Sequence, residues 1–398
     1  MKTMAIISEY NPFHNGHAYQ INQHRTACGV DCVIAVMSGN FVQRGAPAVC
    51  DKWTRAEMAL SGGADLVIEL PVVYATQSAE RFAHGAVSLI HSLFGVDYLS
   101  FGSECGDISV LHKVADILAQ DSFQDEITQE MQNGNSYPAA RLTLLCQKLG
   151  EEFRSILTEP NNLLAIEYLK SLLLLKSDIT PITLKRSIAH HANKPKENFS
   201  SASHIRDCIE NKEDVRALIP GKAFEIFSSA INSGLAPVSA QEADNIITYL
   251  LRTKTAEELR KLPDMTEGLE YRFIDAARKH TTISEIAEAV KSKRYTRTRI
   301  DRTLMHLLLG ITKEDVELPP QYYRVLGANS VGTAFLKMQK ENSLPVITKV
   351  ANAKLGTEKA MRMFEIDCRA TDIYSMLYPD KKYARAGLDC VKSPVIIK

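Results

Sequence analysis

The fold is decided by residues 4–17, which read Met-Ala-Ile-Ile-Ser-Glu-Tyr-Asn-Pro-Phe-His-Asn-Gly-His. Residues 4–8 form an apolar run that is typical of a short buried strand. Asn11-Pro12 marks a turn directly after it, and His14-Asn-Gly-His17 opens a helix. The sequence therefore predicts a strand, a turn and a helix in immediate succession, with two histidines at the start of the helix.

Further strand and helix patterns follow this unit at regular spacing. Apolar runs predict strands at 32–37, 65–70 and 97–102, and a last strand at 178–184. Asp51 and Ser78 are in place to cap helices at 52–60 and 78–94. We therefore expect an α/β fold with a Rossmann-like, doubly wound parallel sheet, in which ligands bind at the carboxyl ends of the strands.

The remainder of the chain has a different pattern. Residues 212–312 show helical periodicity with few strand signals, and Pro319-Pro320 marks a boundary before a tail of short helices and strands. We expect three parts: a ligand-binding α/β domain at 1–210, a helical region at 211–318 and a small C-terminal α/β element at 319–398.

Composition is that of an ordinary globular protein, with 45% hydrophobic residues, 24% charged residues and a formal net charge of +0. No apolar run is long enough to span a bilayer, and no cleavage site follows the basic start at Lys2. We expect a cytoplasmic protein with no membrane partner. The eight cysteines show no C-x-x-C pair, so we expect reduced thiols and no zinc site.

The two histidines of the opening stretch suit phosphate chemistry. His14 and His17 are three residues apart at a helix start, where free N–H groups and a partial positive charge lie. Gly16 leaves room for a nucleotide to approach the backbone. The group could stabilise a pentavalent phosphorus and a departing pyrophosphate. The alternative is a pair of surface histidines in a turn.

A second phosphate signal lies far along the chain at residues 201–206, which read Ser-Ala-Ser-His-Ile-Arg. Hydroxyl and N–H groups at a helix start can bind phosphates, and Arg206 adds a planar cation. Ser201 and Ser203 would supply the hydroxyls. The alternative is a simple helix cap.

Three further candidate nucleotide contacts lie near predicted strand or helix ends. Gly102 ends the strand at 97–102, Arg186 follows the strand at 178–184, and Asn162 opens a helix. A turn glycine, a surface cation and a capping residue are the respective alternatives. The loop at 38–45, which reads Ser-Gly-Asn-Phe-Val-Gln-Arg-Gly, displays polar groups after the second strand or is an ordinary connection.

A basic segment occupies residues 291–302. If it is helical, its cations spread over a broad surface, which fits contact with a phosphate backbone better than a single ion-pair face does. The alternative is a solvated helix with acidic neighbours. The candidate nucleic-acid contacts are Lys291, Lys293, Arg294, Arg297, Arg299 and Arg302.

Taken together, these motifs resemble those of the bacterial tRNA(Met) cytidine acetate ligases, a family of nucleotidyltransferases with the HIGH motif. The resemblance covers nearly the whole chain. Ala202 agrees with this family's Ser-Ala-Thr-x-Ile-Arg form, and Ser203 keeps the hydroxyl of the threonine. The stretches that carry the resemblance are 9–17, 37–45, 63–71, 100–104, 160–162, 182–186, 201–206 and 293–297.

The resemblance implies that ATP and acetate form acetyl-adenylate and pyrophosphate, and that the acetyl group passes to N4 of the wobble cytidine of elongator tRNA(Met). Mg²⁺ would bridge the phosphates, with no protein ligand that we can name. His14 and His17 would be catalytic. The implied nucleotide contacts are Ile7, Ser8, Glu9, Tyr10, Asn11, Pro12, Phe13, His14, Asn15, Gly16, His17, Gln20, Gly102, Asn162, Arg186, Ser201, Ser203 and Arg206.

Two other functions remain open on the residues alone. One is an adenylyltransferase acting on a small phosphorylated metabolite, which would need neither the basic segment nor the long tail. The other is a nucleotide-sensing RNA-binding protein without catalysis, which would not need both His14 and His17.

Overall fold

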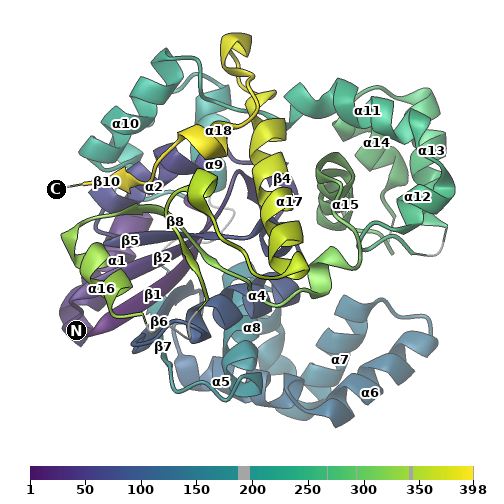
Figure 1. Ribbon diagram of the computed structural model, residues 1–398. Helices are drawn as coiled ribbons and strands as arrows, with labels where there is room; N and C mark the ends of the chain where they lie inside the picture. Colours follow the sequence, from purple (N-terminus) through teal and green to yellow (C-terminus); the bar gives the residue numbers. More distant parts are fainter. Residues whose placement is uncertain (187–197, 267, 293, 340–343, 398) are drawn as a thin grey trace.

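The computed structural model describes residues 1–398 except 187–197, 267, 293, 340–343 and 398. Its centre is a set of parallel strands in the order β5-β2-β1-β6-β7 (Figure 1). All residues of β2 and β5 are buried, as their continuous apolar runs predicted. The strands are β1 (Thr3–Ser8), β2 (Cys32–Ser38), β5 (Leu66–Leu70), β6 (Tyr98–Ser103) and β7 (Thr180–Lys185).

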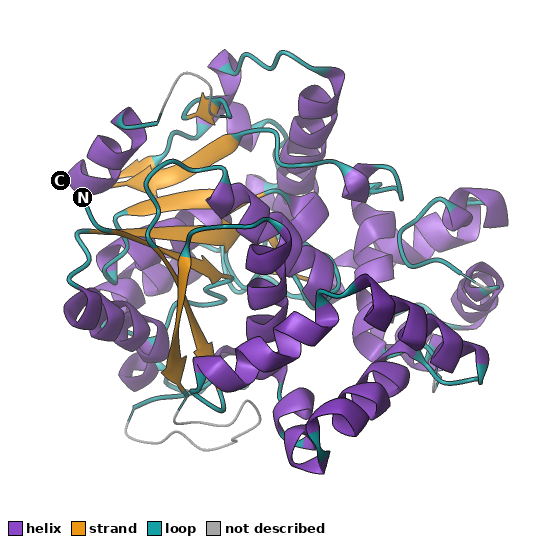
Figure 2. Cartoon of the chain, turned by 90° about the horizontal axis from the view of Figure 1, so that it is seen from below, coloured by secondary structure: helices purple, strands orange, loops and turns teal. Residues whose placement is uncertain are grey.

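Helices cover both faces of this sheet (Figure 2). One hydrophobic cluster joins α1 (Asn15–Cys28), α2 (Lys52–Ser61), α9 (Ala202–Glu210) and α10 (Gly221–Asn232) to one face. A second cluster holds α4 (Ala79–His91), α5 (Ile108–Leu118) and α8 (Pro160–Leu174) on the other face. The predicted α/β fold with a mostly parallel sheet is confirmed. Shorter or peripheral elements of this part are β3 (Phe41–Val42), β4 (Ala46–Pro47), α3 (Val72–Ala75), α6 (Asp121–Gln132) and α7 (Tyr137–Leu149).

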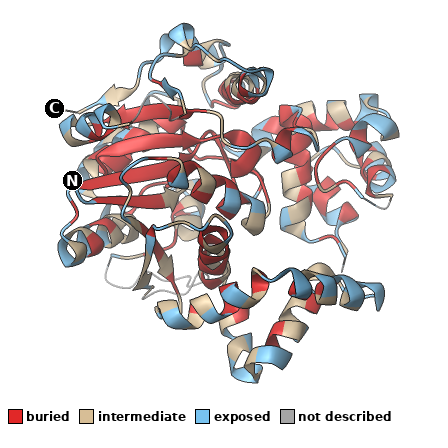
Figure 3. Cartoon of the chain, turned by 60° about the horizontal axis from the view of Figure 1, so that its bottom comes forward, coloured by how far each residue is buried: buried red, intermediate tan, exposed pale blue. Residues whose placement is uncertain are grey.

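Burial follows the same layering. The central strands are buried along their length, whereas the surrounding helices each expose one side (Figure 3). Asp51 and Ser78 cap α2 and α4 as predicted, because each side chain accepts a hydrogen bond from a backbone N–H of the first turn. In the part of the chain that the structure describes, no helix is long and apolar enough to cross a membrane.

A group of helices at 244–309 lies to one side of the sheet (Figure 1). The basic segment lies here, and it is not one continuous helix. Helix α14 ends at Val290, and α15 begins at Arg297. A turn between them is closed by hydrogen bonds between Ser292 and Tyr295. The helices are α11 (Asp244–Thr253), α12 (Ala256–Arg260), α13 (Leu269–Lys279), α14 (Ile283–Val290) and α15 (Arg297–Leu309).

The C-terminal part adds strands to the same sheet. Strand β8 pairs antiparallel with β5, and β9 and β10 pair parallel with β8. The division of the chain into three domains stays a prediction, but these pairings join residues 319–398 to the N-terminal sheet directly. The elements are β8 (Tyr323–Ala328), α16 (Ser330–Lys337), β9 (Val346–Ile347), α17 (Glu358–Ser375), α18 (Leu388–Val391) and β10 (Val395–Ile396).

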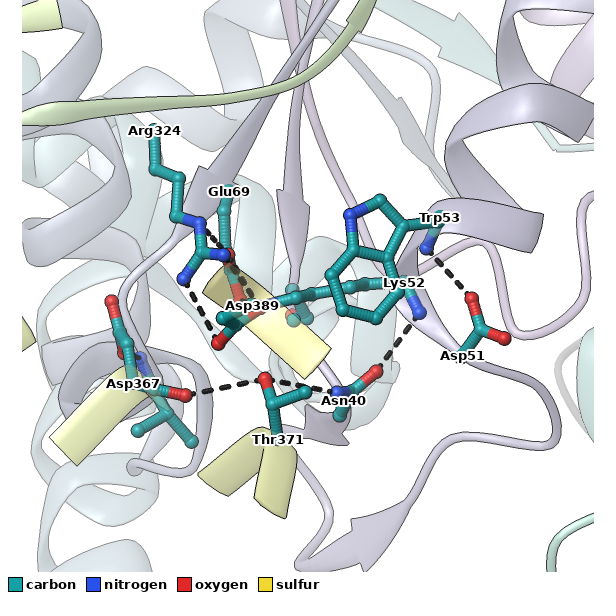
Figure 4. A network of polar contacts seen from close by, with 12 residues as sticks. Asn40, Asp51, Lys52, Trp53, Glu69, Arg324, Asp367, Thr371 and Asp389 are labelled. Carbon is teal, nitrogen blue, oxygen red and sulfur yellow. Dashed lines mark hydrogen bonds and ion pairs between the residues drawn. The ribbon is translucent and has the colours of Figure 1, made fainter. Parts of the chain in front are cut away.

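A buried charge network seals this junction (Figure 4). The ammonium group of Lys52 lies 2.9 Å from Glu69 and 3.0 Å from Asp389. Arg324 on β8 lies 3.2 Å from Glu69 and 2.5 Å from Asp389. Two cations thus face two carboxylates, and removing any one would leave a buried charge uncompensated at a cost of about 3–5 kcal/mol.

Candidate active site

The two histidines of the opening stretch are locked in place by the cap of α1. Nδ1 of His14 accepts a hydrogen bond from the Gly16 N–H at 3.1 Å, and the His14 N–H donates to Nδ1 of His17 at 3.2 Å. In the neutral rings the proton must therefore be on Nε2. The rings are stacked, with centroids 3.7 Å apart. Each imidazole thus presents an Nε2–H donor on the side away from its capping contact.

Burial keeps these rings neutral. Burial first, and then the charges of Arg186 and Arg206, lower the pKa of His14 from 6.5 to about 3. The pKa of His17 is also well below its ordinary value, because of burial and then the His14 and Arg186 charges. At neutral pH both rings are hydrogen-bond donors without charge.

Gly16 has a structural duty that the sequence did not reveal. A Cβ atom at this position would lie 2.9 Å from Cε1 of His14, so a side chain would push the capping ring aside. The glycine therefore holds His14 in its cap, in addition to leaving the helix start uncovered.

The other residues of the opening stretch pack around the two histidines and hold the turn before α1. Asn11 is buried, and its side-chain oxygen accepts the Val49 N–H at 2.7 Å. Tyr10 and Phe13 pack against the ring of His17, with centroids 4.7 and 5.5 Å away. Most of these residues are thus scaffold. Ile7, Ser8 and Glu9 are half-buried at the carboxyl end of β1, Pro12 is buried in the turn, and Asn15 bonds the backbone oxygens of Asn198 and Ala217.

Two arginines reach the histidines from distant segments. Arg206 on α9 donates to the Asn11 backbone oxygen at 2.6 Å. Arg186 follows β7, and its side chain packs over Gly102, where a Cβ would lie 3.2 Å from it. In the described part of the chain neither arginine forms an ion pair within 4.0 Å, and the Arg186 Nε is buried without a hydrogen-bond partner. Burial lowers the pKa of both guanidinium groups, which nevertheless remain charged.

The segment at 201–206 is a helix start, as expected. This agrees with the phosphate-site interpretation and with the alternative of a simple helix cap. Ser201 caps α9 by accepting the His204 N–H at 3.2 Å, and its hydroxyl lies 3.0 Å from that of Ser203. The cap leaves the Ser203 hydroxyl and the first turn of α9 beside Arg206. The simple-cap alternative therefore describes Ser201 without accounting for Arg206, which is half-buried.

Asn162 acts on its neighbours through its side chain. It is buried, and its side-chain oxygen accepts the N–H groups of Glu104 at 2.9 Å and Cys105 at 3.1 Å. The Glu104 carboxylate returns the contact by accepting the Asn162 N–H at 2.8 Å. This reciprocal cap fixes the turn that follows β6 and Gly102.

A pocket at the carboxyl ends of β6 and β7 brings several of these groups together. It lies where ligands bind in sheets of this kind. Ser201, Ser203, Arg206 and Asn162 are not among the residues that line it. The lining includes His14, His17, Gln20, Gly102, Arg186 and Ser200.

Sequence reasoning missed a buried arginine beneath the site. Arg55 on α2 is fully buried and donates to the backbone oxygens of Glu9, Ser38, Gly39 and Cys50. It thereby ties the loop after β1 to the loop after β2. Nothing in the local sequence distinguishes it from a surface arginine on an amphipathic helix.

The basic segment is largely engaged within the protein. Lys291 lies 3.1 Å from Glu288, and Arg297 lies 2.9 Å from Asp301. Arg299 donates to the Asp264 backbone and to Thr266. Arg302 is mostly buried near Asp264, Arg294 is exposed, and Lys293 lies outside the described residues.

The loop at 38–45 joins this region to the α/β part. Gly45 has a φ of +79°, and a Cβ there would lie 2.3 Å from the Arg302 backbone nitrogen. Gln43 in the same loop donates its N–H to the Glu9 carboxylate at 2.8 Å and its side chain to the Gln77 oxygen at 2.9 Å. The second turn of α15 and the end of β1 are therefore linked through one short loop.

The fold and this pocket define a nucleotidyltransferase. The HIGH Nucleotidyl Transferase family matches residues 1–388, so the chain belongs to that family. It belongs, more narrowly, to the tRNA(Met) cytidine acetate ligases. The ligase of that name from Thermoanaerobacter sp. (strain X514) is 45% identical, with 98% of each chain covered. The ligase from Acetivibrio thermocellus is 39% identical, with both chains fully covered.

Solved structures agree with this assignment. Thermotoga maritima TmcAL bound with alpha-thio ATP is 36% identical and matches with a TM-score of 0.92 over 100% of both chains. The apo form of the same protein matches with a TM-score of 0.93. The resemblance inferred from the motifs is confirmed.

Proposed function

We propose that this chain uses ATP to activate acetate as acetyl-adenylate and transfers the acetyl group to N4 of the wobble cytidine of elongator tRNA(Met). The observation that carries the proposal is that two neutral imidazole donors at the start of α1 lie close to two arginines, Arg186 and Arg206. This arrangement suits the anionic oxygens of a triphosphate. The full-length similarity to tRNA(Met) cytidine acetate ligases supports the choice of acetate and cytidine.

In the first step, a carboxylate oxygen of acetate attacks the α-phosphorus, and the bond from this phosphorus to the pyrophosphate oxygen breaks. The nucleophile enters as an anion and pyrophosphate leaves as an anion, so no proton needs to be transferred. Neutral donors are therefore sufficient. The Nε2–H groups of His14 and His17 would donate to oxygens whose charge grows in the transition state.

The outgoing pyrophosphate requires cations and hydroxyls. Arg206, Ser203 and the start of α9 would hold it, with Ser201 shaping that helix start. Arg186 would bind a phosphate at the opposite wall. Gly102 would let the nucleoside approach β6, and Asn162 would hold the turn that makes this approach possible.

Mg²⁺ would accompany the triphosphate rather than occupy a site built by the protein. Among the described residues, no group of three or more His, Cys, Asp and Glu side chains could hold a metal ion. The donor set around the pocket consists of imidazole, guanidinium and hydroxyl groups, which do not match the carboxylates that Mg²⁺ prefers. No step is therefore assigned to the ion.

In the second step, the cytidine N4 amine attacks the acetyl carbonyl, AMP leaves with the former carboxylate oxygen, and the amine loses a proton. The base must be presented from its loop for this attack. Arg294 and Arg297 of the helical region at 211–318 would contact the tRNA backbone, and the α/β part at 1–210 would hold ATP. As a tRNA-modifying enzyme the protein would act in the cytoplasm.

Two assays test the proposal. Purified protein with ATP and acetate should release pyrophosphate, and labelled acetate should then appear in tRNA(Met) but not in a tRNA with an unmodified uridine at the wobble position. An adenylyltransferase would release pyrophosphate only with its phosphorylated metabolite. A non-catalytic sensor would bind ATP without releasing any. Absence of label in tRNA(Met) under turnover would refute the ligase.

A further inference from the structure

One face of α1 carries a chain of polar side chains that continues from His17 to residues without a role in the proposed mechanism. His17, Gln20 and His24 follow at spacings of three and four residues, so they lie along one stripe of the helix. Beyond His17, this stripe meets Ser100 at the middle of β6. Ser100 is fully buried and His24 is nearly so. Gln20 also lines the nucleotide pocket, which makes its orientation important.

The hydrogen bonds along this chain have a single consistent direction. The Thr183 backbone lies close to the His24 ring and raises its pKa, as a carbonyl oxygen that accepts from a ring N–H does. Nδ1 of the same ring lies 2.7 Å from the Ser100 hydroxyl oxygen. The donating nitrogen is therefore Nε2, and in the neutral ring Nδ1 is an acceptor. Ser100 must donate its single hydroxyl proton to His24.

The Ser100 oxygen can then only accept from its other neighbour. Gln20 Nε2 lies 2.9 Å from this oxygen, at hydrogen-bond distance. An amide oxygen in its place would face a hydroxyl whose proton is already used. Because burial lowers the pKa of His24, the ring stays neutral and this direction holds at neutral pH. The network therefore decides which end of the Gln20 amide faces Ser100, a choice that the shape of the amide alone does not settle.

We propose that Ser100 and His24 are positioning residues which fix the Gln20 amide with its oxygen toward the nucleotide pocket. Within the described residues, no group bonds the Gln20 Oε1 atom. The pocket therefore offers an acceptor at this point and selects a nucleoside that donates there. The donor is the 6-amino group of adenine or a ribose hydroxyl. This inference rests on the proposed function only in so far as the pocket binds ATP.

Equilibrium binding without acetate or tRNA tests the inference separately from catalysis. Titration calorimetry would compare ATP with inosine triphosphate, which lacks the 6-amino group, and with 2′-deoxyATP and 3′-deoxyATP. The native protein should bind the analogue that lacks the relevant donor about tenfold more weakly, because the Gln20 oxygen is then left without a partner. Equal affinity for all four nucleotides would overturn the inference.

Two substitutions should relax this discrimination. Ser100→Ala removes the acceptor that holds the amide nitrogen. His24→Leu frees the Ser100 hydroxyl to donate, which lets the amide rotate. In both variants, ATP should bind only about threefold more tightly than the same analogue, or less, instead of tenfold. Ser171→Ala is the matched control, because it removes another buried hydroxyl, bonded at 2.8 Å to the Glu167 oxygen, far from the pocket.

A double mutant separates positioning from general damage. In the Gln20→Met background there is no amide to orient, so adding Ser100→Ala should leave the nucleotide preference unchanged. If Ser100→Ala weakens all four nucleotides by one common factor, or alters the preference in the Gln20→Met background too, Ser100 does not act through Gln20. Tight ATP binding without pyrophosphate release in the presence of acetate would instead refute the proposed function and leave the inference standing.

Discussion

Two parts of this molecule carry clustered cations, and they treat them differently. At the nucleotide site, Arg186 and Arg206 are half-buried beside His14. Glu104 lies near Arg186 and Glu9 near Arg206, but among the described residues neither arginine has a carboxylate at ion-pair distance. In the basic segment, Lys291 and Arg297 are each within 3.1 Å of a carboxylate. The first set bears an electrostatic cost that an anionic ligand would relieve, whereas the second is already compensated by the protein.

This difference shows that a run of cations in a sequence does not by itself indicate an uncompensated positive charge in the structure. Six cations in the twelve residues 291–302 indicate an exposed electrostatic surface, but acidic residues at 264, 288 and 301 offset much of it. Two arginines separated by twenty residues give no such signal, yet the fold brings both of them close to His14. Clustering in space matters here more than clustering along the chain.

The largest effect should come from the uncompensated site. Arg206→Gln should lower the rate of pyrophosphate release by about 100- to 1000-fold, because a preorganised donor to the departing phosphates is lost. Single-turnover kinetics with saturating ATP would measure it. Arg369→Gln is the matched control, since Arg369 on α17 also donates to backbone oxygens, those of Leu309 and Gly310. Equal losses in both variants would show a structural effect only.

A smaller effect is expected when the basic segment is reversed in charge. The double variant Arg294→Glu, Arg297→Glu should weaken tRNA binding about tenfold or more and make its salt dependence shallower by about two units, one for each phosphate contact. Filter binding at several salt concentrations measures both. Pyrophosphate release without tRNA should stay near the native rate. Unchanged binding would remove this segment from the RNA interface.

Acid should destabilise the nucleotide site through His14. Its pKa is about 3 in the folded protein and 6.5 otherwise, so below pH 6.5 the unfolded chain binds the proton more readily. Stability is therefore lost as the pH falls from 6.5 towards 3, and above 6.5 this group has no effect. His14→Gln should reduce the fall in melting temperature between pH 7.5 and pH 5 by a few degrees. His84→Gln, at an exposed position on α4, should leave that fall unchanged.

The smallest expected effect tests most directly whether an acidic residue of the protein competes with tRNA for a cation of the basic segment. Asp301→Asn removes the carboxylate that neutralises Arg297, so tRNA binding should tighten by about twofold to threefold at low salt. Asp275→Asn is the control, because Asp275 forms the same i,i+4 pair with Lys279 on α13. Weaker tRNA binding by Asp301→Asn would mean that the pair orients Arg297 instead of competing with RNA for it.

The sequence predicted the strands and the helix starts well, because those depend on local chemistry. The apolar run of β2 and the caps at Asp51 and Ser78 are examples. The pairing of β8 with β5 was not predictable in this way, since nothing within residues 323–328 specifies a partner more than 250 residues earlier.

The candidate site divides in a similar manner. The position of His14 and His17 at a helix start follows from a motif of four residues, whereas the contact between Gly16 and the His14 ring does not. Arg55 and the chain from Gln20 to His24 depend on contacts between separate elements. For His24 the spacing from His17 was an available signal, but its partner Ser100 lies 76 residues away. The local structure of the basic segment could not be predicted in this way either, because Ser292 and Tyr295 close a turn in its middle.

The buried network between Lys52, Glu69, Arg324 and Asp389 has a consequence for how the protein folds during its synthesis on the ribosome. Synthesis proceeds from the N-terminus at about 5–20 residues per second. Until residue 324 has emerged, the outer edge of β5 has no partner strand, and until residue 389 has emerged, Lys52 lacks one of its two carboxylates. The nucleotide-binding half is made first but completed last, so its exposed strand edge must be protected for most of the time that translation takes.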